Sequence, residues 1–327
     1  MDRRDSRSGR GALGASLLVA SALLLPSASW AQPYAYVSNE KSNDVTILDT
    51  ASDEVLGTIP VGDRPRGIGL SPDGRKLYLA LGEEDVIAVV DTAARKVIAK
   101  IPAGTDPESF AVSPDGTKLY VSNEDANTAS VTDIATGRVV ATVPVGIEPE
   151  GVAVSPDGKL VYVTGETSHT VSVIDAAAHK VTATILVGSR PREAAFSPDG
   201  SRAYVTAEIG GVVSVIDVAT SKVIATIKVE RRGAKPKGVV VSPDGKRVYV
   251  ANGASNDITV IDPATNKVLT YVPVGKRPWG IAITPDGKKL YTANGVSNDV
   301  SVIDTTTLKV TGTVRTGRGP WGIAIGR

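Results

Sequence analysis

Short runs in which apolar and polar residues alternate occupy most of the chain, and turn-forming residues bound each run. Residues 107–145 show the arrangement once. The runs 109–113, 118–123, 130–134 and 139–145 are separated by a Ser-Pro-Asp-Gly turn, a polar loop and a Thr-Gly turn. Alternation with a period of two and many β-branched residues, without a helical period, predicts four short antiparallel strands. Pro presets the backbone of such a turn, and Gly accepts the left-handed conformation that closes it.

This four-strand unit recurs along the chain. Its turn begins at Ser71, Ser113, Ser155, Ser197, Ser242 and, with Thr in place of Ser, Thr284, in steps of 42, 42, 42, 45 and 42 residues. An Asp near the end of the third strand marks seven copies: Asp49, Asp91, Asp133, Asp175, Asp217, Asp262 and Asp304. One repeat of this length cannot bury its own apolar face, and its four-stranded form is typical of a propeller blade.

The two ends of the sequence predict how the ring closes. Residues 34–39 match the second strand of a unit, and residues 320–325 match a first strand. The last strand is therefore expected to complete the first blade as its innermost strand, which pairs edges that would otherwise stay open. The predicted fold is all-β: a seven-bladed β-propeller with four antiparallel strands per blade, closed by the C-terminal strand in the N-terminal blade.

Residues that recur in every unit are expected to serve the scaffold. The third-strand Asp can bond the backbone of the turn that follows it, and its seven copies are too far apart to share a metal. The second-strand tyrosines are expected to pack between neighbouring blades, each with a partner for its hydroxyl group. They are Tyr36, Tyr78, Tyr120, Tyr162, Tyr204, Tyr249 and Tyr291.

Two second-strand segments carry a family resemblance. Leu119-Tyr120-Val121-Ser122-Asn123 and Val248-Tyr249-Val250-Ala251-Asn252 are similar to the motif of the bacterial YVTN-family β-propeller repeat proteins. Residues 208–217, 294–304 and 319–325 resemble a periplasmic subgroup associated with pyrroloquinoline-quinone (PQQ)-dependent alcohol catabolism. The resemblance implies export and a supporting role, and it implies no established reaction.

The first 31 residues predict a cleaved secretory signal peptide. Four Arg residues among the first ten precede a largely apolar run from Ala12 to Leu25, and Ser29-Trp30-Ala31 places small residues at the cleavage positions. The run is too short to span a bilayer, for which about 20 residues are needed. We therefore expect a periplasmic propeller of residues 32–327, without membrane attachment after cleavage.

Composition removes several kinds of chemistry. Without the signal peptide, 32 basic and 33 acidic side chains remain, so no global field attracts nucleic acid or a membrane. The absence of cysteine excludes thiolate nucleophiles, zinc–thiolate sites, iron–sulfur clusters and covalently attached haem. The chain has two histidines, His169 and His179, and no nucleophile-elbow sequence for a Ser-His-Asp arrangement. His169 is the one candidate axial ligand for a non-covalent haem. We expect neither a metal nor a cofactor.

Departures from the repeat predict a binding face around the mouth of the central channel. A proline begins every first strand, and the loops on this face are carried by a rigid scaffold, where binding residues concentrate. The residues beside these prolines form a basic, tryptophan-bearing arc and an acidic arc: Arg64 and Arg66, Asp106 and Glu108, Glu148 and Glu150, Arg190 and Arg192, Lys235 and Lys237, Arg277 and Trp279, and Trp321. His169 stands in a neighbouring loop where other units have Asn.

These residues support more than one hypothesis. We expect a monomeric, non-catalytic binding module, accessory to PQQ-dependent alcohol oxidation, with another periplasmic protein as its partner. The first alternative is a small anionic ligand, PQQ included, held by Arg and Trp. The second is a lactonase-like hydrolase, and calcium could bind the acidic arc. A third interpretation is that the loops have no specific binding role and that their charges only balance one another across the channel.

Trp279 and Trp321 distinguish the first two hypotheses. A protein partner requires both indoles to be exposed as anchors, whereas a small ligand requires them to line a pocket.

Overall fold

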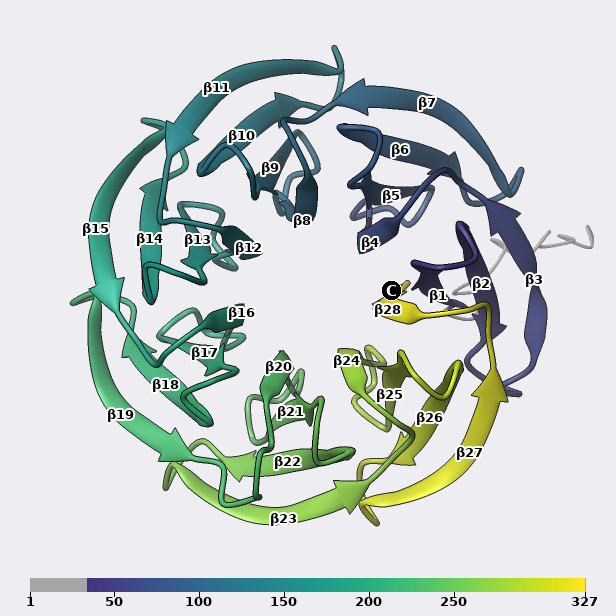
Figure 1. Cartoon of the computed structure of the whole chain (residues 1–327), viewed down its shortest axis with the longest axis vertical. Coiled ribbons are helices and arrows are strands. Elements are labelled where there is room, and N and C mark those ends of the chain that lie inside the picture. Colours follow the sequence, from purple (N-terminus) through teal and green to yellow (C-terminus); the bar gives the residue numbers. More distant parts are fainter. Residues whose placement is uncertain (1–33, 327) are drawn as a thin grey trace, which may run out of the picture. The chain divides into compact units, whose positions relative to one another are not determined.

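The computed structural model describes residues 34–326, and these residues form 28 strands in seven four-stranded sheets (Figure 1). Every strand pairing is antiparallel. The predicted all-β, seven-bladed propeller is confirmed. No helix in this range is long and apolar enough to cross a lipid bilayer. The predicted signal peptide, residues 1–31, lies outside the described residues.

Each blade has four strands, counted from the channel outwards. The innermost strands are β28 (Pro320–Ile325), β4 (Pro65–Leu70), β8 (Pro107–Val112), β12 (Pro149–Val154), β16 (Pro191–Phe196), β20 (Pro236–Val241) and β24 (Pro278–Ile283). The second strands are β1 (Tyr34–Asn39), β5 (Lys76–Leu81), β9 (Lys118–Asn123), β13 (Leu160–Gly165), β17 (Arg202–Ala207), β21 (Val248–Asn252) and β25 (Lys289–Asn294).

The remaining strands form the outer half of each blade. The third strands are β2 (Asp44–Asp49), β6 (Val86–Asp91), β10 (Thr128–Asp133), β14 (Thr170–Asp175), β18 (Val212–Asp217), β22 (Asp257–Asp262) and β26 (Asp299–Asp304). The outermost strands are β3 (Val55–Pro60), β7 (Lys96–Pro102), β11 (Arg138–Pro144), β15 (Lys180–Leu186), β19 (Lys222–Lys228), β23 (Lys267–Pro273) and β27 (Lys309–Arg315). We number the blades 1 to 7 in chain order, so that blade 1 holds β28 and β1–β3.

Strand β28 closes the ring as the sequence predicted. It pairs with β1 in antiparallel register, with Ala35 opposite Ile325 and Val37 opposite Ile323. In Figure 1 the yellow β28 lies beside the purple β1, so the two ends of the propeller share one blade. This pairing gives β1 a partner on both sides, so β1 has no open edge.

The hydrophobic core lies between neighbouring blades. Tyr204 of blade 5, for example, packs against Val239 and Val250 of blade 6. The second-strand tyrosines are buried, which confirms their predicted packing role. One part of that prediction is wrong: the hydroxyl of Tyr162 is buried without a hydrogen-bond partner among the described residues, and Tyr162 belongs to a hydrophobic cluster of blades 4 and 5.

The turns at the ends of the third strands explain the recurrent Asp. Oδ1 of Asp133 accepts a hydrogen bond from the backbone N–H of Thr136 at 2.9 Å, and Asp304 accepts one from Thr307 at 2.7 Å. The other five copies make equivalent bonds to the turn that follows them. The recurrent Asp therefore belongs to the scaffold, as predicted.

Candidate functional site

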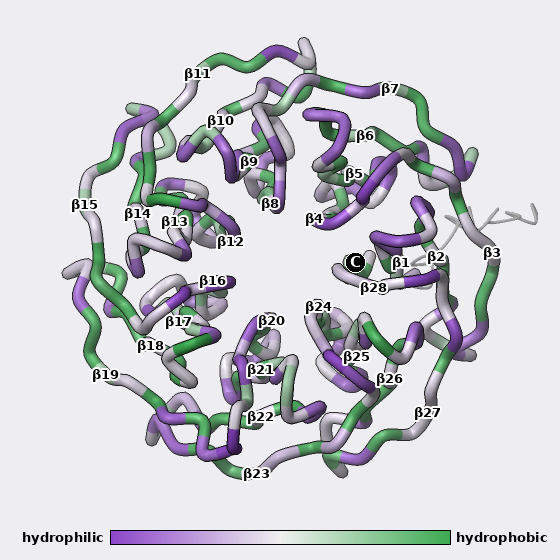
Figure 2. Tube along the Cα trace, viewed as in Figure 1, coloured by the Kyte–Doolittle hydropathy of each residue, from purple (hydrophilic) through white to green (hydrophobic). Residues whose placement is uncertain are grey.

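The innermost strands place one side chain each at the mouth of the central channel. Every such strand begins with a buried proline, and the residue after it lines the channel. These residues are Arg66, Glu108, Glu150, Arg192, Lys237, Trp279 and Trp321. Figure 2 shows hydrophilic starts of β4, β8, β12, β16 and β20 and paler starts of β24 and β28. The side chains surround a cavity of about 570 Å³, which we call the channel-mouth cavity.

The residue before each proline has a left-handed backbone, which turns the chain into the innermost strand. Its φ lies between 50° and 65° at Arg64, Asp106, Glu148, Arg190, Lys235, Arg277 and Gly319. In six of these turns a side chain of the preceding blade lies within hydrogen-bond distance of the backbone N of this residue; the turn at Lys235 is the exception, because Gly211 stands at the equivalent position. Oδ1 of Asn256, for example, accepts a hydrogen bond from the backbone N–H of Arg277 at 2.8 Å. In blade 4, His169 takes this place: its Nδ1 lies 3.2 Å from the backbone N of Arg190 and 2.8 Å from the carbonyl oxygen of Glu166.

Two arginines between blades 1 and 3 are neutralised by their neighbours. Arg64 bonds Asp106 at 2.5 Å and Glu108 at 2.9 Å. Arg66 bonds Glu40 at 2.9 Å and also pairs with Glu108. Burial lowers the pKa of Arg66, but its bonds to Glu108 and Glu40 outweigh burial and raise it. These cations are therefore already matched by carboxylates.

A second group of ion pairs joins blades 4 to 6. Arg190 Nε lies 2.7 Å from Glu166 Oε2, and Arg192 Nη2 lies 2.7 Å from Glu150 Oε1. Arg192 also pairs with Glu166. The charges that the sequence arranged as two arcs thus pair largely between neighbouring blades rather than across the channel.

The remaining side of the mouth has a different composition, which we call the tryptophan–cation cluster: Arg66, Lys237, Arg277, Trp279 and Trp321. The two indole rings meet edge to face, with centroids 3.9 Å apart. Lys237 Nζ lies 3.4 Å from the centroid of Trp321, and the guanidinium carbons of Arg66 and Arg277 lie 4.3 Å and 4.4 Å from Trp321 and Trp279. Trp321 is only 8% exposed. Among the described residues, Arg277 has no carboxylate partner.

Burial and pairing set the charge states inside the channel. Burial favours the neutral form of Glu150, but Arg192 and Lys237 outweigh it and hold the pKa of Glu150 at about 2. Burial lowers the pKa of Lys237 to about 8, although Glu150 lies 3.0 Å away. Burial also raises the pKa of Glu193 to about 7.

Glu193 is a channel residue that the sequence interpretation missed. It occupies the third position of β16, which is a small residue in every other innermost strand: Gly67, Ser109, Gly151, Gly238, Gly280 and Gly322. That departure from the repeat is visible in the sequence two residues after Pro191.

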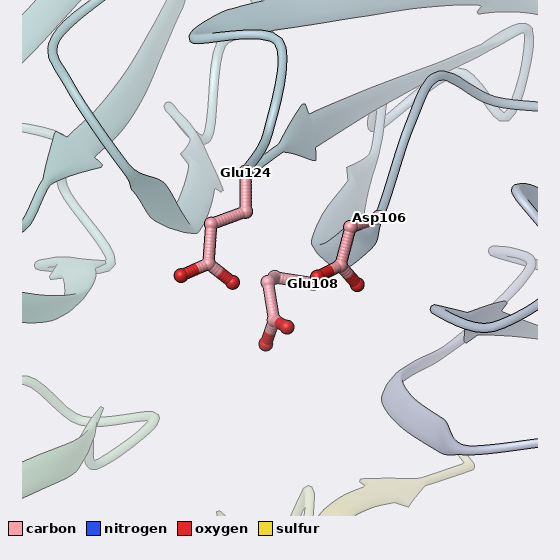
Figure 3. Close-up of side chains that lie close together, drawn as sticks. All are labelled: Asp106, Glu108 and Glu124. Carbon is pink, nitrogen blue, oxygen red and sulfur yellow. The ribbon is translucent and has the colours of Figure 1, made fainter.

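Three carboxyl groups meet at the edge of the cavity between blades 2 and 3. Asp106, Glu108 and Glu124 each place an oxygen within 4.8 Å of the others, and Figure 3 shows the groups pointing toward one another. Burial and the neighbouring Glu108 raise the pKa of Glu124 to about 8. Glu108 is buried, and its Oε2 has no hydrogen-bond donor among the described residues unless Glu124 carries a proton. Since Arg64 already bonds two of these carboxylates, the cluster suits a shared proton better than a metal ion.

A family described as "Lactonase, 7-bladed beta-propeller" matches residues 28–143 and 176–323. The chain belongs to this lactonase propeller family. A YNCE-like β-propeller family also matches residues 104–199. No curated protein matches the chain.

Two solved structures share the fold of this lactonase-family propeller. Hydrazine synthase of Kuenenia stuttgartiensis is 27% identical, with a TM-score of 0.75, over 83% of this chain and 92% of that one. A functionally unknown protein from Desulfotomaculum acetoxidans DSM 771 is 18% identical, with a TM-score of 0.79, over 90% of this chain and 99% of that one. The second match shows the fold alone.

Most of the residues proposed from the sequence meet at the mouth of this lactonase-family propeller. The channel-mouth cavity is lined by Arg64, Arg66, Glu150, Arg190, Arg192, Lys235, Lys237, Arg277, Trp279 and Trp321. Glu108 lines a narrower space of about 130 Å³ within the channel, and Asp106 lies in the carboxyl cluster. Glu148 is exposed and accepts a hydrogen bond from Thr167. His169 serves the turn of Arg190 and is not among the described residues that line the cavity.

Proposed function

We propose that this protein binds a small molecule with two or more carboxylate or phosphate groups in the channel-mouth cavity, against the tryptophan–cation cluster. A volume of about 570 Å³ is within the range of ligand pockets. The observation that carries the proposal is Arg277, a cation at the rim of the cavity without a carboxylate partner among the described residues, held over the ring of Trp279. An anionic ligand supplies the missing partner.

The indole rings favour a small ligand over a protein partner that uses them as anchors. Trp321 is buried, and both indoles line the cavity rather than an open surface. Cations of the protein itself cover their faces, so the rings position Lys237 and Arg277 instead of offering a bare stacking surface. The site therefore selects a ligand by its negative charge more than by a flat aromatic ring.

The resemblance to propellers associated with PQQ-dependent alcohol catabolism supplies the first ligand to test. PQQ carries three carboxylates and meets the charge requirement of the site. In this proposal the protein is exported to the periplasm and acts beside quinoprotein oxidation as a non-catalytic binding module. The fold by itself carries no such assignment, because one propeller architecture serves many functions.

Binding is tested by calorimetry and thermal shift with PQQ, benzene-1,3,5-tricarboxylate and the corresponding uncharged triamide. Ligand at about 100 times its Kd should stabilise the protein by about 2.7 kcal/mol, and the triamide should have no effect. We expect Arg277→Ala to weaken binding about tenfold or more, because a charge-assisted hydrogen bond is worth roughly 1.5–3 kcal/mol. Lys276→Ala is the matched control, since Lys276 is exposed and does not line the cavity. If no polyanion binds in calorimetry or raises the unfolding temperature, the proposal is wrong.

A second candidate function is hydrolysis of a lactone, favoured by the family match and by Glu124 at the cavity. Ionised Glu124 would take a proton from the water that attacks the lactone carbonyl, and Arg64 would stabilise the resulting oxyanion. Because the pKa of Glu124 is raised to about 8, lactone opening should accelerate as pH rises through 8. The reaction is excluded if the protein does not open lactones faster than the uncatalysed rate, or if the Glu124→Gln variant keeps full activity.

A further inference from the structure

The channel-mouth face of the propeller is divided into two sectors of opposite charge. This face consists of the loops that join second to third strands and the loops that join one blade to the next. Its charged side chains can be sorted by their exposure and by the blade that carries them. The division concerns exposed residues around the rim, whereas the ion pairs described above lie inside the mouth.

The basic sector extends from the loop between β19 and β20, across blades 6 and 7, to the loop between β1 and β2. Its exposed cations are Lys41, Arg231, Arg232, Lys235, Lys276, Arg277, Arg315 and Arg318. Glu230 is the exposed carboxylate among the described residues of this sector, and Arg231 is partly neutralised by the buried Asp257 at 3.0 Å. Three extra residues between β19 and β20 contribute to this excess, because that loop interrupts the 42-residue period.

The acidic sector covers blades 2 and 3, from the loop between β3 and β4 to the loop between β11 and β12. Its exposed carboxylates are Asp63, Glu83, Asp85, Asp125 and Glu148. Lys100, an exposed cation of blade 2, is paired with Glu84. In Figure 1 blade 3 lies across the ring from β20–β27, and the two sectors meet at blade 1, where the loop between β1 and β2 adjoins the loop between β3 and β4.

We propose that two copies of this chain associate through their channel-mouth faces, acidic sector against basic sector. The two copies are related by a two-fold axis that lies in the plane between their faces, along the diameter that separates the sectors. A rotation of 180° about this axis places the acidic sector of each copy over the basic sector of the other. Both sectors of both chains are then matched at once, as an isologous two-fold interface requires. An acidic protein of another kind would match the basic sector and be repelled by the acidic sector.

Apolar side chains on the same face supply contacts that charge alone lacks. Ile147, Ile209 and Val296 are exposed in loops of this face. Most other large exposed apolar residues lie on the outermost strands instead, where Val140 and Ile224 are examples. In the paired state the two channel-mouth cavities open toward each other. The association does not depend on which ligand the cavity holds.

Sedimentation velocity of the purified protein tests the association. At about 50 mM NaCl we expect twice the mass of one chain, and at about 1 M NaCl the mass of one chain, because the Debye length falls to about 3 Å. A protein that sediments as one chain at low salt up to about 50 µM would overturn the proposal and leave the basic sector for an acidic partner. A pair that persists unchanged in 1 M NaCl would also overturn it.

Charge reversal supplies the sharper test, because the two sectors can be changed separately. One variant makes the acidic sector basic: Glu83→Lys, Asp125→Lys and Glu148→Lys. The other reverses three cations of the basic sector and removes most of its positive charge: Lys41→Glu, Arg232→Glu and Lys276→Glu. We expect each variant alone to raise the dissociation constant of the pair by about tenfold or more. An equimolar mixture should recover a mixed pair, since one face is then mainly basic and the other mainly acidic.

The mixture also separates loss of pairing from loss of folding. All six substituted residues are exposed, so each variant should keep the thermal unfolding midpoint of the wild-type protein within a few degrees. Two folded variants that remain single chains when mixed would overturn the proposed arrangement of sectors.

Discussion

At the scale of single residues, the same residue type takes different charge states within one channel. Glu150 and Glu193 both lie in the channel. Burial favours the neutral form of Glu150, but the charges of Arg192 and Lys237 outweigh burial and hold its pKa at about 2. Burial dominates at Glu193 and raises its pKa to about 7. Glu124 behaves like Glu193, because burial and a neighbouring carboxylate act in the same direction. Arg192 and Lys237 also act on Glu193, but there burial and the neighbouring Glu150 outweigh them.

Glu124→Gln should stabilise the protein and flatten its dependence on pH. The folded protein holds the proton of Glu124 up to about pH 8, whereas an unfolded chain releases it near 4.5. Between these values the folded state binds more protons, so the free energy of unfolding falls as pH rises. After a discount for solvent screening we expect a gain of roughly 1–2 kcal/mol at pH 7.

Urea denaturation between pH 5 and pH 8.5 measures this effect. Asp125→Asn is the matched control, because Asp125 is the exposed neighbour of Glu124 in the same loop. A Glu124→Gln protein with the same pH profile as the wild type would show that Glu124 is ionised in the folded state.

Two buried tyrosines in equivalent positions should respond oppositely to loss of the hydroxyl. The Tyr291 hydroxyl donates to Asp53 Oδ1 at 2.5 Å, whereas the Tyr162 hydroxyl has no partner among the described residues. Tyr291→Phe should cost about 1.5–3 kcal/mol, because a hydrogen bond to a charged group is lost. Tyr162→Phe should be neutral or slightly stabilising. Equal losses in chemical denaturation would contradict this assignment.

At the scale of elements, five of the seven innermost strands have glycine as their third residue, where a neighbouring innermost strand leaves little room for a side chain. A Cβ on Gly238 of β20 would lie 2.2 Å from the carbonyl oxygen of Trp279 on β24. A Cβ on Gly151 of β12 would lie 2.4 Å from the carbonyl oxygen of Arg192 on β16. The close approach brings the side chains of adjacent strands, such as Lys237 and Trp279, into contact at the channel mouth.

Gly238→Ala should therefore destabilise the propeller by about 1–3 kcal/mol through overpacking against β24. Gly312→Ala in the outermost strand β27 is the control, because its Cβ would meet Val302 at an ordinary 3.8 Å. The control should be neutral or slightly stabilising, since alanine restricts the unfolded chain more than glycine does. Guanidinium denaturation of the two variants measures the difference. A smaller loss for Gly238→Ala than for Gly312→Ala would show that the strands can move apart.

At the scale of the whole propeller, β28 joins the end of the ring to its beginning. Strand β1 pairs with β28 on one side and β2 on the other, so blade 1 combines residues that are almost 300 positions apart in the chain. Ring closure makes every blade dependent on two neighbours, including blade 1. The basic and acidic sectors also exist only at this scale, because each draws its residues from several blades.

A chain that ends at Gly319 lacks β28 and should lose several kcal/mol of packing and strand pairing. At about 2 °C per kcal/mol for a protein of this size, the loss corresponds to a fall in Tm on the order of 10 °C. The open edge of β1 should also promote aggregation. A chain that ends at Ile325 keeps β28 and is the matched control. Scanning calorimetry and light scattering measure both effects, and an unchanged Tm in the shorter chain would contradict the role of β28.

Most of the fold could be predicted from the repeat, but much of the site could not. The alternation of residues 107–145 and its recurrence gave four strands per blade, seven blades and the closing strand. The prolines and the residues beside them located the binding face. The pairing of Arg192 with Glu166 was not predictable, because these side chains come from different blades and their separation depends on how blades pack.

The sequence by itself determined the architecture of this protein and the face that carries its departures from the repeat, because a fixed period constrains every blade to the same local structure. The tertiary structure alone decided which charges are satisfied. It buried Trp321 against Lys237, left Arg277 without a carboxylate partner among the described residues, and brought Glu124 to Glu108. These outcomes depend on distances of a few ångströms between blades and on exclusion of water, and neither quantity is encoded in the spacing of residues along the chain.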